Sequence, residues 1–327
     1  MAIGKQSDFT IYQEEFYGGQ YEALTSLVDV FNGASAGAIQ MTATDMKGDY
    51  GKESFLKEIS SLVTRRDLTS VNTASDLAMT MDEYISVKVN RKIGPVAQTM
   101  NSWRKLGASP AEMSFQLGRM IGEAKAKDMI YTSIKAANAA ISGQAGANVD
   151  KSGGTPTTLT HTYLVNAMAL RGDKANDIVA WIGHSKSYFD LVGQTLSDKV
   201  TNVADTVIYG GGPGTLGKPF IVIDSADLID TAGTPDDYFV LGLTAGAVRC
   251  IESEEQELVS EVVTGLEQLA VRVQGEYAFN LAVKGFKWDV ANGGANPTDG
   301  NLGTSSNWDV AGTSDVKRLA GVRLQVK

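Results

Sequence analysis

The sequence predicts an α+β fold in which a long central helix separates an extended two-stranded loop from an α/β section and a final β-rich section. Three observations predict this order: alternating apolar and polar residues before residue 100, helical spacing of apolar residues from 110 to 142, and short strand-like apolar runs after 175. Of the 327 residues, 43% are hydrophobic and 20% are charged, a composition that excludes a disordered chain.

Residues 1 to 40 are polar and rich in glycine, with aromatic residues scattered among them. Only one short stretch, residues 21–31, has the spacing of an amphipathic helix. We therefore expect an N-terminal arm over residues 1 to 40 that needs a partner surface.

Residues 41 to 100 carry the pattern of a half-exposed sheet. Apolar and polar residues alternate in two runs, 77–81 and 85–89. Because no second apolar layer follows within this block, the two runs predict an extended hairpin. Gly94 and Pro95 mark its end, before the chain becomes helical.

The clearest local signal is a helix start at Ser109. This residue occupies the cap position, Pro110 the first helical position, and Glu112 completes a capping box. Apolar residues recur at helical spacing as far as Ile141, and Gly143 stops the helix. At about 1.5 Å per residue the helix spans about 50 Å, much more than an average helix of about 11 to 12 residues. Such a helix suits a spine along which other elements pack.

The rest of the chain combines an α/β layer with a β-rich end. Residues 143–158, rich in Gly, Ser and Thr, predict a linker. A helix is expected over 160–171, a buried strand over 178–183 and a helix over 187–196. Further strands are expected at 220–224, 238–242, 257–263, 269–273, 277–283 and 321–326.

The most enzyme-like feature is the segment 183–187, Gly-His-Ser-Lys-Ser, at the predicted strand-to-helix junction. It partly matches the nucleophile elbow G-x-S-x-G of α/β-hydrolases, with Ser185 as the nucleophile. However, Ser187 occupies the position of the second glycine, and neither His161 nor His184 follows the serine as the hydrolase order requires. We therefore favour a helix cap by Ser185 or Ser187 over catalysis.

No other motif predicts a catalytic, cofactor-binding or metal site. The glycine-rich loop 210–217 precedes Lys218, but Pro219 follows where a phosphate-binding P-loop needs Ser or Thr. Two histidines and one cysteine cannot complete a zinc site without carboxylates. The single Cys250 lies in an apolar segment, which predicts a buried structural thiol.

The formal net charge of −9 excludes a protein whose main task is to coat nucleic acid. The acidic clusters 224–227 and 252–257 lack the ligand spacing of a calcium-binding EF-hand, so we expect solvated faces there. The main basic concentration comprises Lys88, Arg91 and Lys92, with Arg104 and Lys105 nearby. We expect these basic residues to pair with acidic segments of identical neighbouring subunits.

Three segments and the order of the parts point to one family. The segments are V-K-V-N-R-K-I-G-P at 87–95, L-G-K-P-F-I-V-I-D at 216–224, and G-F-K-W at 285–288 followed by N-P-T at 296–298 and N-W-D at 307–309. Together with the order of arm, loop, long helix, α/β section and β section, they resemble the major capsid protein of tailed bacteriophages of the Hong Kong 97 type. The similarity covers nearly the whole chain.

That resemblance implies a Hong Kong 97-like capsid fold with five parts. They are an N-terminal arm (1–40), an extended β-hairpin or E-loop (41–100), a peripheral (P) domain with the spine helix (101–174), an α/β axial (A) domain (175–240), and C-terminal β-strands that return to the P domain (241–327). Some relatives cross-link a loop lysine to a neighbour, and Lys47, Lys52 and Lys57 lie in the loop. Nothing in the sequence identifies a reacting pair.

The resemblance also implies a structural role with no catalytic residue, cofactor or metal. The chain would assemble with itself into pentamers and hexamers of an icosahedral head that encloses double-stranded DNA, without sequence-specific DNA binding. We expect scaffold, portal and decoration proteins as partners, no membrane contact, assembly in the host cytoplasm and a final place in the virion capsid. An encapsulin-like nanocompartment is the alternative with the same fold, and a serine hydrolase using Ser185 is the alternative of another class.

Overall fold

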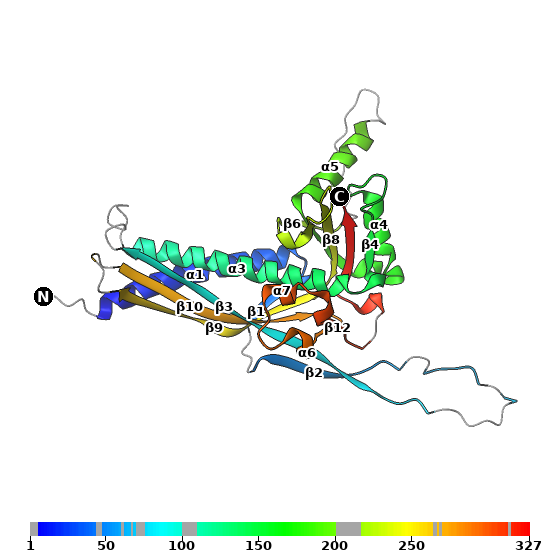
Figure 1. The fold of residues 1–327 in the computed structure, drawn as a ribbon, viewed down its shortest axis with the longest axis horizontal. Helices are drawn as coiled ribbons and strands as arrows, with labels where there is room; N and C mark the ends of the chain where they lie inside the picture. Colours follow the sequence, from blue (N-terminus) through cyan, green and yellow to red (C-terminus); the bar gives the residue numbers. More distant parts are fainter. Residues whose placement is uncertain are drawn as a thin grey trace.

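The computed structural model describes residues 6–43, 48–59, 62–66, 68–69, 76–99, 110–200, 217–263, 267, 270–312 and 315–327. Figure 1 shows a long sheet with two helices along it, a hairpin that extends away from the sheet, and a smaller α/β unit at the C-terminal end of the long helix α3. Helices and sheets are thus mixed, which confirms the predicted α+β class.

Five strands form the long sheet in the order β1-β9-β10-β3-β2. They are β1 (Ile39–Ala43), β2 (Tyr50–Leu56), β3 (Met81–Thr99), β9 (Val248–Val263) and β10 (Ala270–Val283). β10 pairs antiparallel with β9 on one side and with β3 on the other, while β1 runs parallel to β9. Strands from the two ends of the chain therefore share one sheet.

Strand β3 is longer than the sequence predicts. It continues through Gly94 and Pro95 to Thr99, so the prediction that the hairpin ends at these two residues is wrong. Opposite them, the pairing with β10 shifts register between Val273 and Gly275. This irregularity accommodates a proline, which has no N–H for the ladder, and a glycine with φ of +71°.

Helix α3 (Pro110–Ser142) confirms the predicted long helix in position and length. Its predicted cap, Ser109, lies outside the described residues. At the other end, the side-chain amide of Asn148 donates hydrogen bonds to three carbonyl oxygens of the last turn and the following loop, at 2.7 to 3.1 Å. These bonds satisfy carbonyl groups that have no partner within the helix.

A second long helix, α1 (Gln6–Ala34), lies along α3. The arm that the sequence predicted to need a partner surface therefore finds that surface on α3 of the same subunit. Glycine is the physical reason, because it lets the two backbones meet directly. A Cβ on Gly118 would collide with the carbonyl oxygen of Phe16, and a Cβ on Gly122 would lie 2.8 Å from the carbonyl oxygen of Gln20.

The α/β unit contains a second sheet of six strands, ordered β4-β13-β8-β5-β6 with β7 on β8. The strands are β4 (Asn148–Asp150), β5 (Ile178–Gly183), β6 (Phe220–Val222), β7 (Ile229–Asp230), β8 (Asp237–Thr244) and β13 (Gly321–Val326). Its helices are α4 (His161–Ala169) and α5 (Ser185–Val200). These bounds confirm the predicted strand at 178–183, the strand at 321–326 and the helix after residue 160.

The α/β unit recruits more of the chain than the sequence suggests. The predicted linker 143–158 contributes β4, and the last strand, β13, joins β4 and β8 and not the long sheet. Apolar packing is the cause, since Val322 and Leu324 of β13 are buried in one cluster with Leu164 of α4 and Trp181 of β5. Of the strands after residue 247, β9 and β10 thus lie in the long sheet, whereas β13 lies in the sheet of the α/β unit.

The remaining elements are short, and the two strands among them form an antiparallel sheet of their own. They are β11 (Phe286–Trp288), β12 (Trp308–Val310), α6 (Val290–Gly293), α7 (Asp299–Leu302), and the 3-10 turns η1 (Ala145–Ala147), η2 (Gly172–Asp177), η3 (Ala226–Leu228), η4 (Ser305–Asn307) and η5 (Val316–Arg318). One buried apolar cluster contains Val87 and Phe279 of the long sheet together with Leu241 of the α/β unit. The two sheets and α3 therefore share a continuous core.

Replacing Gly118 with alanine should destabilise the protein, although alanine favours helices. The added methyl group would collide with the carbonyl oxygen of Phe16, so we expect the free energy of unfolding to fall by about 1 to 3 kcal/mol, measured by urea denaturation. Gly18→Ala is the matched control, because a Cβ there meets no atom within 4 Å; it should raise stability by up to about 1 kcal/mol. Equal effects of the two variants would contradict packing through glycine.

Candidate assembly surfaces

The hairpin carries apolar side chains that the subunit does not bury. Beyond the β2–β3 ladder, Val63 is 91% exposed and Leu68 81% exposed. Leu62, Leu77 and Met79 are also more than half exposed. Figure 1 shows that this segment extends away from both sheets. An apolar group that protrudes from a folded body indicates a surface that is buried on another molecule.

Asp82 anchors the base of this hairpin to the body. Its carboxylate accepts hydrogen bonds from Nζ of Lys287 at 3.0 Å and from the backbone N–H of Gly312 at 3.0 Å, and it pairs with Nζ of Lys57 at 3.3 Å. The side chain is only 10% exposed. Burial alone would raise the pKa of Asp82, but these donors outweigh it and hold the pKa well below its usual range.

Charged side chains link α3 to the sheet that it covers. Lys125 of α3 is buried, pairs with Glu252 of β9 and lies 5.0 Å from the ring centre of Tyr277. One turn further, Asp128 accepts hydrogen bonds from Arg91 of β3 at 3.0 Å and from the hydroxyl of Tyr277 at 2.8 Å. Burial and the adjacent Asp128 raise the pKa of Tyr277, so its hydroxyl keeps the proton that it donates.

The basic residues singled out in the sequence find partners within the subunit. Lys88 pairs with a glutamate of β9, and Arg91 pairs with Asp128 and also with Asp299 at 2.6 Å. The expected pairing with neighbouring subunits is therefore wrong for Lys88 and Arg91. Lys92 is exposed, while Arg104 and Lys105 lie outside the described residues.

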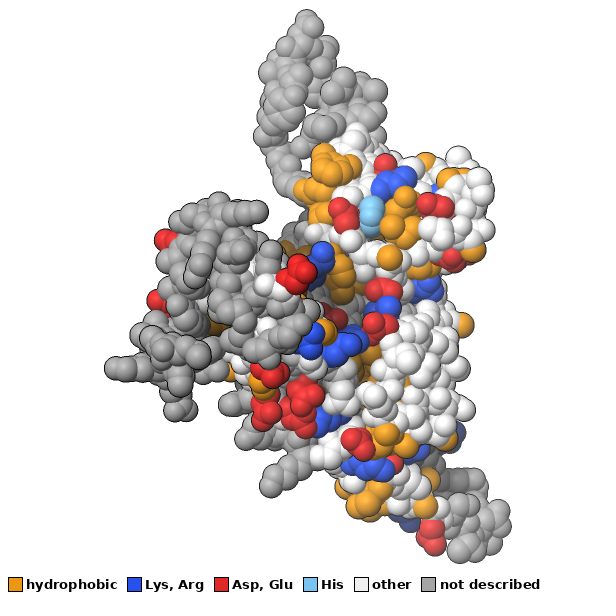
Figure 2. Space-filling model, turned by 60° about the vertical axis from the view of Figure 1, so that its left-hand side comes forward, with side chains coloured by type: hydrophobic (Ala, Val, Ile, Leu, Met, Phe, Trp, Pro, Cys, Tyr) orange, Lys and Arg blue, Asp and Glu red, His pale blue; other side chains and the backbone are white. Residues whose placement is uncertain are grey.

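The acidic segment 252–257 is not the uniformly solvated face that the sequence predicted. Glu252 and Glu254 form the ion pairs with Lys125 and Lys88, because strand β9 runs beneath α3 and is separated from β3 by one strand, β10. On the face drawn in Figure 2, acidic and basic side chains are interspersed, and the coloured basic side chains form no continuous patch.

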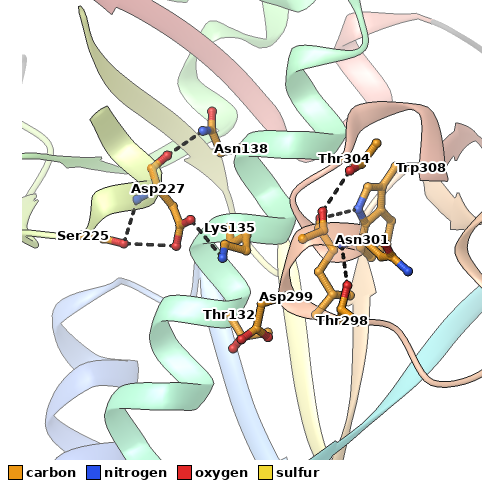
Figure 3. Close-up of polar contacts among 12 residues, drawn as sticks. Thr132, Lys135, Asn138, Ser225, Asp227, Thr298, Asp299, Asn301, Thr304 and Trp308 are labelled. Atoms are coloured by element: carbon orange, nitrogen blue, oxygen red, sulfur yellow. Dashed lines mark hydrogen bonds and ion pairs between the residues drawn. The ribbon is translucent and has the colours of Figure 1, made fainter. Parts of the chain in front are cut away.

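An open groove of about 370 Å³ lies beside α3, between the α/β unit and α7. Figure 3 shows Lys135 extending from α3 toward Asp227 of η3. Thr132 of α3 and Asp299 of α7 lie next to each other nearby. The ammonium of Lys135 lies 3.1 Å from the Asp227 carboxylate, and the amide of Asn138 donates to the Asp227 carbonyl oxygen at 2.8 Å. Asp299 is likewise paired with a cation, Arg91, so the carboxylates of Asp227 and Asp299 both have partners within the subunit.

His184 and Asp224 form the cap of helix α5. Nδ1 of His184 accepts the backbone N–H of Lys186 at 3.2 Å, and Asp224 accepts the N–H of Ser185 at 3.1 Å. Hydrogen bonds from Ser185, with the adjacent His184, lower the pKa of Asp224. The sequence therefore misassigned the cap, which it placed on Ser185 or Ser187; the hydroxyl of Ser187 is buried and has no hydrogen-bond partner among the described residues.

The same geometry disfavours Ser185 as a nucleophile. Its hydroxyl lies 3.5 Å from Nδ1 of His184, and that nitrogen already accepts the N–H of Lys186, so it is not free to act as the base. His161 begins a different helix, α4. The chain thus assembles Ser185, His184 and Asp224 in one place, but as a helix terminus.

The other candidate residues are structural where they are described. Cys250 is buried, as predicted, and burial raises the pKa of its thiol. The glycine-rich loop lies outside the described residues except for Gly217, as does Lys47, whereas Lys52 pairs with Glu83. Within the described residues, no group of three or more His, Cys, Asp or Glu side chains is placed to hold a metal ion. No helix in that part of the chain is long and apolar enough to span a membrane.

Comparison with known proteins identifies a family. The model of the Gp13-like family, described as "Major capsid protein 13-like", matches residues 8–323. The fold is similar to the capsid asymmetric unit of cyanophage Pam1, with a TM-score of 0.52, 12% identity and 88% of each chain covered. It is also similar to the capsid of Ralstonia phage GP4, with a TM-score of 0.50, 9% identity, and coverage of 88% of this chain and 87% of that one. No curated protein sequence matches the chain.

Replacing Lys125 with methionine should destabilise the subunit strongly, because Glu252 would lose its partner in a buried site. We expect the free energy of unfolding to fall by about 3 to 5 kcal/mol, measured by chemical denaturation. The double variant Lys125→Met/Glu252→Gln should recover most of that loss. Lys127→Met, at an exposed lysine of the same helix, should change stability by no more than about 0.5 kcal/mol; equal effects of the two single variants would refute the role of the buried pair.

Proposed function

Because the chain belongs to the Gp13-like family of major capsid proteins, we propose that it builds the icosahedral head that encloses the double-stranded DNA of a tailed bacteriophage. It is a capsid shell protein that self-associates in the virion. The observation that carries the proposal is the combination of one continuous core with a hairpin whose apolar side chains are exposed. A rigid body with a protruding apolar segment can join copies of itself head to tail, the contact type that closes rings and shells.

Each part of the fold has a role in this proposal. The hairpin β2–β3 serves as the E-loop, the long sheet with α3 serves as the peripheral domain, and the α/β unit serves as the axial domain. The shared core supports this division, because it keeps the two sheets in one orientation while the hairpin stays free to reach a neighbour. Helix α1 serves as the N-terminal arm and is docked on α3 of its own subunit.

The charge pattern supports loose contact with the enclosed DNA. With a net charge of −9 and paired cations in the long sheet, the subunit offers little for phosphate groups to bind. We propose pentamers and hexamers of this chain, with separate scaffold, portal and decoration proteins, and assembly in the host cytoplasm. The Ser185 geometry supports a role without catalysis.

Expression of the chain, alone and with the neighbouring phage genes, tests the proposed function by negative-stain electron microscopy. We expect closed shells, or rings of five and six subunits, when the accompanying proteins are present. Discrete monomers or dimers in both preparations would contradict the proposal. Uniform shells from the chain alone would support the capsid function and refute the separate scaffold.

Replacing Val63 with serine should weaken assembly without destabilising the subunit. Val63 is 91% exposed, so its replacement removes apolar contact only in the assembled state. We expect the protein concentration needed for assembly to rise about fivefold or more, on the basis of about 1 to 1.5 kcal/mol lost at each copy of the contact, measured by light scattering. The thermal midpoint of the free subunit should stay the same. Thr64→Ser is the matched control; an unchanged assembly threshold for Val63→Ser would show that the tip is not an interface.

A further inference from the structure

We propose that Asp82 is a positioning residue for assembly: it fixes the direction in which the hairpin leaves the body and so delivers the apolar tip to a second copy of the chain. This inference rests on the proposed function. It adds a specific residue and a physical device to that function.

Asp82 lies where the ordered ribbon ends. The β2–β3 ladder pairs Phe55 with Asp82 and finishes one step later, where Leu56 faces Met81. Beyond this point the described residues of the hairpin, 57–59 and 76–80 among them, do not form strands. A contact at this position therefore controls how the whole distal segment is aimed.

Three segments of the chain meet at the carboxylate of Asp82. Lys57 comes from the end of β2, Lys287 from β11, and the backbone N–H of Gly312 from the loop after β12. The last two belong to the body, where Trp288 and Trp308 pack edge to face with ring centres 5.0 Å apart. Asp82 thus ties both strands of the hairpin to a fixed part of the fold.

Gly312 shows that this junction is shaped for close contact. Its φ of +80° favours glycine, and a Cβ there would lie 3.1 Å from the ring of Phe55. A short distance along the hairpin, Glu58 forms an ion pair with Arg318 of η5. The base of the hairpin is therefore held from two sides by the C-terminal segment, with Asp82 as the buried contact.

The sheet alone does not aim the hairpin, because the pairing of β3 with β10 ends at Val87, and beyond it the β2–β3 ladder joins only those two strands. A two-stranded ribbon is marginally stable and easily twisted. Each side of the loop 57–80 has about 12 residues, which reach at most about 40 Å when extended. A rotation of about 10° at the base would then move the tip by about 7 Å, more than a packed interface tolerates. Anchoring at Asp82 removes this freedom.

Asp82→Asn in the full chain tests the inference, with Glu83→Gln as the matched control. Glu83 lies on the same strand, but its carboxylate is 3.8 Å from Lys52 in a solvent-exposed pair, which contributes little. Hydrogen–deuterium exchange on unassembled protein reports residues 50–58 and 81–87 separately from α3. In Asp82→Asn we expect the exchange rate of the hairpin amides to rise about tenfold or more, while the exchange rate of the α3 amides stays the same. The yield of closed shells should fall about tenfold or more. Glu83→Gln should match the wild type in both.

Each outcome decides the point. Hairpin exchange equal to wild type in Asp82→Asn would overturn the anchoring role, and faster exchange with a wild-type yield of shells would overturn the assembly role. If exchange of α3 also rises, the variant has lost its fold; Lys287→Gln, which removes the side-chain donor that the body supplies to Asp82, then replaces it and should show a smaller change in the same direction. If the wild type forms no shells under any condition, the proposed function fails and the assembly role with it, while the exchange data still show whether Asp82 holds the hairpin.

Discussion

The contact between α3 and the sheet beneath it is the constraint on which the rest of the structure depends. Apolar burial supplies most of the adhesion between the two, but it is not directional. The buried ammonium of Lys125 and the guanidinium of Arg91 each need a carboxylate in one place, Glu252 and Asp128 respectively. A slip of the helix by one turn would separate both pairs and leave the buried ammonium of Lys125 without its carboxylate, which costs several kcal/mol. These pairs therefore set the position of α3 along the sheet.

Once α3 is placed, the other parts follow from it. Its first half receives α1 through glycine contacts such as that of Gly118, and its second half holds the α/β unit through Lys135 and Asn138. Because the apolar core continues across all of these elements, the subunit behaves as one body. The hairpin is the exception, since beyond the β2–β3 ladder its apolar side chains lie outside this core. A rigid body and a protruding hairpin are thus two consequences of one arrangement.

This division explains how a chain with neither a recognisable active site nor a cluster of metal ligands in its described residues performs a structural task. A shell requires subunits that keep their shape and contacts that are completed only by a neighbour. The body satisfies the first requirement because ion pairs within the subunit hold its elements together. The charged side chains in these pairs already have partners before assembly. In the shell that we propose, the hairpin satisfies the second, because its exposed apolar residues are buried only when another copy covers them. Stability of the subunit and affinity between subunits are thereby carried by different residues.

The amino-acid sequence by itself determined the elements with strong local signals. The capping box and helical spacing located α3, the apolar run 178–183 located β5, and the order of the parts indicated the capsid family that the whole-chain comparison confirms. Tertiary structure alone decided which surface each element meets. The partner of Lys125 is 127 residues away, and no local pattern identifies Glu252. Likewise, no local pattern identifies Gly118 and Gly122 of α3 as the docking points of α1, because a glycine permits close packing only where another backbone approaches it. The secondary structure of a segment depends mainly on neighbouring residues in the sequence. Contacts between segments depend on the fold, which brings distant residues together.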